Sequence, residues 1–465
     1  MKRRATRTIC VFVLAVAASR HACAGDQAAP PPSADAYPSL QTAIDANPGR
    51  MIRVPAGDYR IDRAVDISAD HTGLYGPGRI VQTNPDADIL TITRASDVVI
   101  DGLTLTRADG AMDATKHGLH ANECTDVTVR NVRVLNNRSQ AGTINFERCT
   151  GGRIAGCDVT NYERVGVDDR TASDLYGYAF KVIDGTGILL TASSGVQITG
   201  NRIVERHLMA DKATKKKFQL GEFTEGAHPT KKGRLAPSGH YANNWHQGSA
   251  IVVTTPEETH HILVRGNYIE NAAQGIDLHA DHLTCTDNVI DHAFIGIKCM
   301  HGSKNVIISD NNLSYIDLWG IVMMPGTASH PAEAATKDQP AKGPNFTSGN
   351  IIANNIISDI GFGYENWIWP EGSRRAISLE SGQLAENPVM FDVLIQGNIV
   401  YDTGHDQILE DGKPVTVPPR YAYAVYITPK PAPRGLRFVG NIFHPGVKGV
   451  SNVPLDSTVN KPVTK

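Results

Sequence analysis

The chain has 465 residues, of which 41% are hydrophobic, 20% are charged and 6% are aromatic. This hydrophobic content excludes a disordered chain, because disordered chains lack the apolar residues that build a core. Seven cysteines in 465 residues are too few for a small scaffold held together by disulfides.

Residues 1–24 have the pattern of a bacterial secretory signal. Four basic residues precede an apolar run over 9–18, and Ala22-Cys23-Ala24 offers a small-residue cleavage site. We therefore expect a secreted protein, periplasmic or extracellular, cleaved near Ala24 and beginning with a disordered linker over 25–36. Without the signal, 40 Lys and Arg face 48 Asp and Glu, a net charge of −8. That charge argues against a nucleic-acid partner, and no later stretch predicts a membrane span.

A short phrase recurs along the chain: an apolar strand, Gly or Asp, Asn, and a second apolar stretch. Its Asn positions are 201, 267, 288, 311, 354, 398 and 441. Between them lies a second phrase, Gly or Ala followed by alternating apolar residues. In the tightest copies one unit takes about 22 residues with no helix, which is typical of a parallel β-solenoid. We expect the Asn side chains to stack between coils, in a bend where Asn tolerates the left-handed backbone conformation.

The opening of the chain adds a more specific pattern. Residues 39–46, SLQTAIDA, predict a short amphipathic helix, and residues 51–59, MIRVPAGDY, follow it as a strand. Together with the repeat, this entry resembles the right-handed parallel β-helix proteins of the pectate-lyase-like superfamily. The resemblance implies an all-β, single-stranded right-handed parallel β-helix over 37–455, with an N-terminal capping helix, long loops flanking one sheet, and a C-terminal tail over 456–465. That superfamily includes lyases, hydrolases, epimerases and tailspikes, so the fold alone leaves the activity open.

Intervals between the repeated Asn residues place long loops at about 206–248, 326–348, 361–375 and 403–422. All four adjoin strands of the second phrase, so we expect them to form the walls of a groove. Lysines in the first loop suit an anionic ligand, and tryptophans in or beside the loops suit sugar rings; alternatively, the lysines are simply solvated and the tryptophans hold loops in place. The predicted substrate-binding residues are Lys231, Lys232, Trp245, His301, Trp319, Trp367, Arg375 and Glu380.

Alternation along the strands predicts which residues face outward. In GIDLHADH, which begins at 275, Asp277 and His279 face outward. In-register stacking with GIKCMHGS, which begins at 296, places Lys298 beside Asp277. The expected polar patch consists of Asp277, His279, Asp281, His282, Lys298 and His301, joined by His240, Tyr241 and His246 from the 206–248 loop.

This patch fits β-elimination on a uronate-containing polysaccharide. The reaction needs a cation to neutralise the uronate carboxylate, a base for the C5 proton and an acid for the O4 leaving group. Lys298 is the predicted base, and His279, His246 or Tyr241 is the acid or an alternative base. Asp277 and Asp281 are hard oxygen ligands that suit Ca²⁺. Alternatively, Asp277 and Lys298 form only an exposed ion pair, worth about 0–1 kcal/mol.

Two other functions stay open beside an anionic-polysaccharide lyase. Glycoside hydrolysis or transglycosylation needs two carboxyl groups, for which Glu147, Asp168, Asp169 and Glu380 are the candidates. Residues 295–311 resemble a polygalacturonase segment, but His292-Ala293-Phe294 stands where that family has paired aspartates. The third function is glycan binding without catalysis.

Two cysteines occupy equivalent positions of adjacent repeats. Aligning GLHANECT with GTINFERC stacks Cys124 on Cys149 at about the 4.8 Å spacing of neighbouring strands, which is within disulfide range. Because export permits oxidation, our hypothesis is a disulfide.

Overall fold

The computed structural model describes residues 30–168, 180–209, 211–220, 223–225, 240–244, 248–362, 371–382, 384–404, 408–415 and 417–455. Met1–Pro31 form a unit of their own, and the fold is that of the second unit, Pro32–Lys465. The predicted signal over 1–24 and the predicted tail over 456–465 lie outside the described residues. In the part of the chain that is described, no helix has the length and apolar character needed to cross a membrane.

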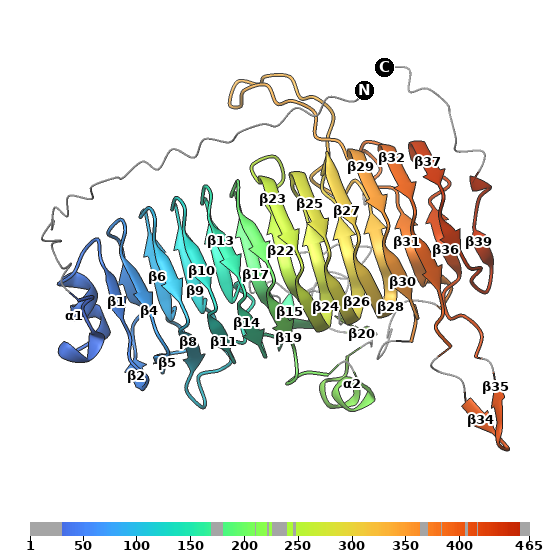
Figure 1. Ribbon diagram of the computed structural model, residues 1–465. Helices are drawn as coiled ribbons and strands as arrows, with labels where there is room; N and C mark the ends of the chain where they lie inside the picture. The colour runs from blue at the N-terminus through green and yellow to red at the C-terminus, as the bar shows by residue number, and fades with distance from the viewer. Residues whose placement is uncertain are drawn as a thin grey trace, which may run out of the picture. The chain divides into compact units, whose positions relative to one another are not determined.

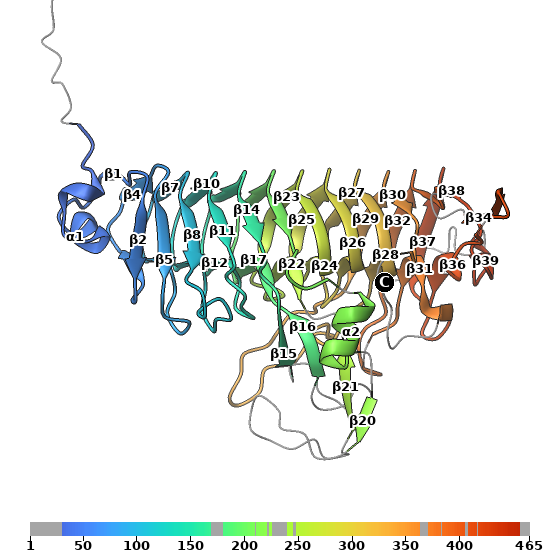
Figure 2. The same cartoon turned by 90° about the horizontal axis from the view of Figure 1, so that it is seen from below.

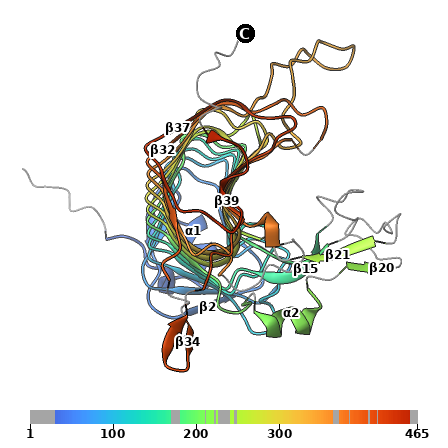
Figure 3. The same ribbon diagram turned by 90° about the vertical axis from the view of Figure 1, so that its right-hand side faces the viewer.

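Pro32–Lys465 fold into a right-handed parallel β-helix, as the repeat predicts. Successive coils stack in chain order (Figure 1), and each coil contributes a strand to three parallel stacks. The view along the stack shows the coils superposed around a common interior (Figure 3). Buried Ile, Val and Leu side chains fill that interior as one continuous core, because a single coil cannot bury its apolar face alone.

The first stack is a 12-stranded parallel sheet. Its strands are β1 (Met51–Arg53), β4 (Gly73–Tyr75), β7 (Val99–Asp101), β10 (Thr128–Arg130), β13 (Arg153–Ala155), β18 (Gln197–Thr199), β23 (His260–Arg265), β25 (Asp281–Thr286), β27 (Val306–Ser309), β29 (Ser348–Ala353), β32 (Phe391–Gln396) and β37 (Arg434–Val439).

The second stack follows the bend that comes after each strand of the first. Its short strands are β2 (Asp58–Ile61), β5 (Arg79–Gln82), β8 (Thr104–Arg107), β11 (Arg133–Leu135), β14 (Asp158–Thr160), β19 (Arg202–Val204), β30 (Ile356–Ser358), β33 (Ile399–Tyr401) and β38 (Ile442–Phe443). In the middle coils, three long strands run through both the second and the third stack. They are β24 (Tyr268–Leu278), β26 (Val289–Cys299) and β28 (Asn312–Met323).

The third stack carries the second repeated phrase and the predicted site. Besides the later halves of the three long strands, it contains β3 (Val65–Ile67), β6 (Leu90–Thr93), β9 (Leu119–Asn122), β12 (Ile144–Glu147), β17 (Thr186–Thr191), β22 (Ser249–Thr254), β31 (Arg375–Leu379), β36 (Tyr423–Ile427) and β39 (Gly449–Ser451). A register shift between Ala293 and Ile295, where β26 pairs with β28, lies before the outward position of Lys298. Beyond it, the registers from β6 to β36 align outward side chains in straight rows along the helix.

Helix α1 (Leu40–Asp45) caps the first coil, as predicted. Leu40, Ala43 and Ile44 are buried, and the Ser39 hydroxyl accepts a hydrogen bond from the Thr42 N–H at 3.1 Å, which satisfies a free N–H of the first turn. The linker expected over 25–36 is structured at its end. Ser33 pairs with Arg53, and a 3-10 helix, η1 (Ala34–Ala36), leads into α1.

An excursion leaves the coils between the second and third stacks (Figure 2). Its four-stranded sheet consists of β15 (Arg164–Asp168), β16 (Phe180–Asp184), β21 (His240–Asn244) and β20 (Phe223–Glu225), and it is accompanied by α2 (Lys212–Phe218). Smaller elements are η2 (Glu371–Ser373) and the hairpin of β34 (Ile408–Glu410) and β35 (Lys413–Val415). The Asn intervals predicted the 206–248 part of the excursion. They missed the 161–185 part, because the count began at Asn201.

The stacked Asn residues form a buried ladder, with one correction to the predicted positions. The Asn311 Nδ2–H donates to Asn355 Oδ1 at 2.9 Å, and Asn355 donates to Asn398 in the same way. Asn355, not Asn354, is therefore the ladder residue. The backbone explanation is also corrected, because the left-handed residue is the one before the ladder, with φ of 56° at Asn354 and 62° at Gly200. The ladder side chains satisfy buried backbone groups on the preceding coil, as when the Asn311 N–H donates to Asn355 Oδ1 at 3.1 Å.

Cys124 and Cys149 lie in adjacent coils, as predicted, but both are free thiols. Each Sγ–H faces a backbone carbonyl, Ile92 O for Cys124 at 3.4 Å and Ala121 O for Cys149 at 3.5 Å. The disulfide hypothesis is therefore wrong for this structure, where both sulfurs pack in the interior as small apolar groups.

The assignment of Asn355, and not Asn354, to the ladder can be tested by measuring stability. Asn355→Ala leaves several buried groups without partners, so we expect a loss of about 1–3 kcal/mol or more in the free energy of unfolding. Asn354→Gly is the matched control, because glycine adopts positive φ without strain and the Asn354 side chain is exposed. Thermal melting compares the two variants. Equal melting temperatures would contradict the assignment of the ladder.

Candidate functional site

The centre of the predicted polar patch lies where β24 and β26 pass through the third stack. Asp277 is directly opposite Lys298 in the parallel register, as the alternation predicted. The Lys298 Nζ is 2.9 Å from Asp277 Oδ2. The next strand places Val322 against Lys298, and the preceding strand places Val252 against Asp277. The ion pair is therefore flanked by apolar side chains along its row.

Asp277 is a buried carboxylate with two cationic or imidazole partners. Asp277 is 6% exposed. The Asp277–Lys298 ion pair is therefore largely buried, unlike the exposed ion pair that the sequence analysis gave as an alternative. The second oxygen, Oδ1, lies 2.7 Å from His279 Nε2. Burial alone would raise the pKa of Asp277, but His279 and Lys298 outweigh burial and hold that pKa well below its ordinary value. Asp277 is therefore ionised throughout the neutral range and orients both partners.

His279 is held at both ring nitrogens. Besides Asp277 at Nε2, its Nδ1 lies 3.0 Å from the Thr254 hydroxyl of the preceding coil. The His301 ring stands edge-on to it, with 4.5 Å between ring centroids. His301 Nδ1 accepts a hydrogen bond from the Ala328 N–H at 3.3 Å, which leaves the proton of the neutral ring on Nε2. Burial, together with His279 and Lys298, lowers the pKa of His301 to about 3, so this ring is neutral at pH 7.

Asp281 does not join this centre. It belongs to β25 of the first stack, where its Oδ2 is 2.9 Å from Lys304 Nζ and its Oδ1 accepts from the Lys304 N–H at 3.1 Å. Its neighbour His282 stacks on His261 at 5.0 Å, on that same side of the coil. Because Asp277 and Asp281 are engaged by different cations, they do not fit the predicted pair of Ca²⁺ ligands. Across the described ranges, no cluster of three His, Cys, Asp or Glu side chains is arranged to hold a metal ion.

Arg375 and Glu380 come together in a second polar cluster, two strands beyond Lys298. Arg375 Nη1 pairs with Glu380 Oε1, and the Thr428 hydroxyl donates to Glu380 Oε2 at 2.8 Å. The Arg375 guanidinium lies 3.4 Å from the ring centroid of Tyr426. Both Glu380 oxygens are thus bonded within this cluster.

The remaining predicted residues divide into two groups. Trp319 packs against an outer apolar cluster, and its indole Nε1–H donates to Ser373 O at 3.0 Å, so it holds a loop rather than offering an open sugar platform. Lys231, Lys232, Trp245, His246 and Trp367 lie outside the described residues, as does Asp169; Tyr241 and Asp168 are described only in their backbone, in β21 and β15.

The outer apolar cluster fastens the excursion to the third stack beside Lys298, and the sequence did not predict it. Outward-facing Phe294, Met300 and Val322 from the coils pack with Ile183 and Leu220 from the excursion. The feature of the sequence that could have predicted this packing was an apolar residue at an outward-facing position of a strand. The packing means that the excursion is part of the folded body next to the site, and is not a detached loop.

Three buried carboxyl groups stand at the root of the excursion and were also not predicted. Glu163, Asp184 and Glu205 are each 0% exposed. Glu205 Oε2 accepts from the Glu163 N–H at 2.9 Å, and Glu163 Oε1 accepts from the Ala273 N–H at 3.2 Å. Burial raises the pKa of Glu163 well above its ordinary value, and the nearby Glu205 and Asp184 charges add to this. Burial likewise raises the pKa of Glu205.

These raised pKa values predict how stability changes with pH. A carboxyl group with a raised folded-state pKa favours folding fully below its unfolded pKa, near 4.3, and that contribution is lost as the pH rises through the folded pKa. Glu163→Gln mimics the protonated group, so its melting temperature should match the wild type near pH 5 and exceed it increasingly towards pH 8. Glu258→Gln, at an exposed position, is the control and should track the wild type. Parallel curves for Glu163→Gln and wild type would contradict this account.

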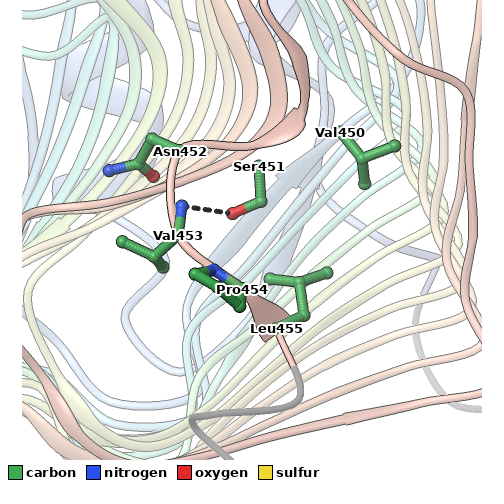
Figure 4. A pocket seen from close by; sticks show the side chains of 6 residues that line it. All are labelled: Val450, Ser451, Asn452, Val453, Pro454 and Leu455. Carbon is green, nitrogen blue, oxygen red and sulfur yellow. Dashed lines mark hydrogen bonds between the residues drawn. The ribbon is translucent and has the colours of Figure 1, made fainter.

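A separate pocket lies at the last coil, away from this chemistry. It has a volume of about 410 Å³ and is lined by Val450–Leu455. Figure 4 shows a hydrogen bond within it, from the Val453 N–H to Ser451 Oγ, whose length is 3.4 Å. The lining contains no titratable side chain, so we assign it no reaction.

Neither a family model nor a curated protein sequence matches the chain. Solved structures do match. The surface adhesin PfbA of Streptococcus pneumoniae is 11% identical with a TM-score of 0.50, and the match covers 90% of this chain and 93% of that one. The exopolygalacturonase of Thermotoga maritima is 10% identical with a TM-score of 0.49, over 78% and 83%. The Dettilon tailspike protein, gp208, is 15% identical with a TM-score of 0.47, over 89% of this chain and 64% of the tailspike, so the chain spans less than two thirds of it.

The likeness to the adhesin shows the fold alone, a right-handed parallel β-helix, as the opening and the repeat predicted. At identities of 10–15%, the activity has to be argued from the site itself.

Proposed function

We propose that the protein is a secreted polysaccharide lyase that cleaves a uronate-containing, anionic polysaccharide by β-elimination. The observation that carries the proposal is the grouping of Lys298, His279 and His301 around one buried carboxylate, Asp277. Secretion rests on the signal pattern of residues 1–24.

Lys298 suits the neutralisation of the uronate carboxylate better than the role of base that the sequence favoured. Its Nζ is held 2.9 Å from the buried Asp277 carboxylate, an ion-pair geometry that suits a positioned cation. A charged Lys298 pairs with the substrate carboxylate, makes the C5 proton more acidic and stabilises the anion that forms when the proton leaves.

His279 is the proposed base. We assign its ring proton to Nε2, which lies 2.7 Å from Asp277 Oδ1, and this assignment leaves Nδ1 as the acceptor, facing the Thr254 hydroxyl. Asp277 holds this tautomer and stabilises the imidazolium that forms when Nδ1 takes the C5 proton. The electron pair of the C5–H bond forms the C4–C5 double bond as the C4–O4 bond breaks. The neutral His301 Nε2–H donates a hydrogen bond to the departing O4, which takes its proton from solvent.

The spacing of carboxylates favours elimination over hydrolysis. Glu147 and Glu380 each lie three coils from Asp277 in the third stack, or about 14 Å at the strand spacing of about 4.8 Å. A hydrolytic pair is about 5–9.5 Å apart. Within the described residues, the centre therefore has one carboxylate, and that carboxylate is already engaged by Lys298 and His279.

The reaction class is tested by its products. Elimination leaves a C4–C5 double bond conjugated to the carboxylate, so cleavage of a panel of uronate polysaccharides should produce ultraviolet-absorbing ends. His279→Ala should lower turnover by about 10²–10⁴, the usual range for a general base. Cleavage without absorbing products would identify a hydrolase instead, and binding without cleavage would identify a glycan-binding protein.

The role of Lys298 is tested by two substitutions. Lys298→Arg keeps a cation beside Asp277 and should retain a measurable part of the activity, although its different shape will reduce it. Lys298→Ala should lose activity and also stability, by about 3–5 kcal/mol, because it leaves a buried carboxylate with one partner fewer. Turnover is compared well below each variant's melting temperature. If Lys298→Arg is as inactive as Lys298→Ala while folded, Lys298 is the base.

A further inference from the structure

Two rows of outward-facing side chains run along the third stack from the N-terminal coils to the proposed centre. The strand registers place each residue of a row directly on the next. The first row consists of Thr91, His120, Asn145, Leu189, Val252, Asp277 and Lys298. The second row consists of Thr93, Asn122, Glu147, Thr191 and Thr254, and continues to His279 through the Thr254 hydroxyl.

At the N-terminal end of these rows stands a second cluster of polar side chains. His120 Nε2 lies 3.1 Å from Glu147 Oε2, with 20% and 29% of the two side chains exposed. The His117 ring lies 4.4 Å from the His120 ring, and its Nδ1–H donates to Gly142 O at 2.8 Å. Asn145 lies between His120 and Leu189 in the first row and is 4% exposed. The cluster thus joins donors and acceptors on two adjacent strands of the same outward face.

Asn145 has an unsatisfied group in this cluster. Its Oδ1 has no hydrogen-bond partner among the residues that the structure describes. A buried acceptor without a partner costs about 1–3 kcal/mol, and a hydroxyl group from a ligand would satisfy it. An asparagine that served only to pack the coil would be cheaper as an apolar residue, like Leu189 at the next position of its row.

The charged groups of this N-terminal cluster are suited to binding sugar hydroxyl groups rather than a second uronate carboxylate. Its guanidinium groups are already paired, Arg148 with Glu147 and Glu123, and Arg94 with Glu123. Burial, with a contribution from His120, lowers the pKa of His117, which favours its neutral form. The cluster presents carboxylate, amide and imidazole groups, which bind sugar hydroxyls, whereas the cation that suits a uronate is Lys298, on β26.

The surface between the cluster and the centre is also fitted to a sugar chain. There the first row is apolar, with Leu189 and Val252, and the second row carries hydroxyls, with Thr191 and Thr254. All four side chains are partly exposed. A pyranose ring has an apolar C–H face and a polar hydroxyl edge, so two parallel rows of this kind match a chain that lies along the helix.

We propose that His120, Asn145 and Glu147 form a second sugar-binding subsite, which takes the hydroxyl groups of an uncharged part of the polymer whose uronate unit reacts at the centre. The subsite is three coils from His279, about 14 Å at the strand spacing. The chain therefore lies parallel to the helix axis and spans several sugar units. This inference rests on the proposed function, since it concerns a more distant part of the same substrate.

The test uses the full chain and oligosaccharides in which one uronate unit is joined to an increasing number of neutral sugar units. For wild type, kcat/KM should rise sharply once the substrate is long enough to reach from the centre to the subsite. Asn145→Ala and Glu147→Gln should each lower kcat/KM about tenfold on long substrates, or about 1.4 kcal/mol, and by less than twofold on a disaccharide. Glu270→Gln, a carboxylate change on the second stack, is the matched control and should behave as wild type. Equal losses on short and long substrates, or none on long ones, would overturn the subsite.

Binding separates failure of the subsite from failure of the proposed function. If no oligosaccharide is cleaved, the lyase proposal fails, and calorimetry of the uncleaved long oligosaccharides still tests the subsite. Affinity that falls about tenfold in both Asn145→Ala and Glu147→Gln, with unchanged melting temperatures, supports the subsite. Unchanged affinity in both variants excludes it. Because Glu147→Gln keeps the size of the side chain, it gives an answer even if Asn145→Ala fails to fold.

Discussion

The in-register stacking of coils is the constraint on which the rest of this structure depends. Parallel strands about 4.8 Å apart leave each coil one way to satisfy its backbone and bury its apolar face. The Asn ladder fixes the bend between the first two stacks, because the Asn355 side chain accepts from both the backbone and the side chain of Asn311. Once the register is fixed, every outward residue is aligned with those of its neighbours. Single substitutions at the same outward position of successive repeats can therefore place functional side chains next to one another.

Burial of the Asp277 carboxylate costs free energy, and the contacts that offset this cost also position its partners. A carboxylate that is 6% exposed is expensive to bury unless it is paired. Lys298 and His279 supply that pairing from the next strand and from two residues along the same strand. The same contacts that remove the cost also hold the Lys298 ammonium and the His279 ring in place. Positioning and stability are therefore the same interaction here, which is why Lys298→Ala should affect both.

The sequence predicted those features that follow from period and alternation. The fold and the Asp277–Lys298 pair follow from a period of about 22 residues and a strand alternation of two, and the cap at 40–45 follows from the amphipathic pattern of residues 39–46. The Asn354 assignment failed because two asparagines are adjacent, and only packing distinguishes the exposed left-handed residue from the buried one. The prediction that Asp281 lies in the same patch as Asp277 failed because the chain has already entered the first stack two residues after His279. There Asp281 pairs with Lys304. The contacts of Thr254 and Glu163 depend on distant segments, and no local pattern contains that information.

The outer apolar cluster limits which part of the third stack is accessible. Outward-facing Val322 and Met300 are buried under the excursion, so the row beyond Lys298 is closed by packed side chains rather than left open to solvent. Before Asp277, by contrast, Val252 and Thr254 are partly exposed, and the polar cluster of His120 and Glu147 remains accessible. The accessible part of the third stack therefore extends towards the N-terminal coils. In the proposed function, a polysaccharide bound at Lys298 would meet the packed excursion on one side and the two rows on the other, so the excursion would give the bound polymer a direction.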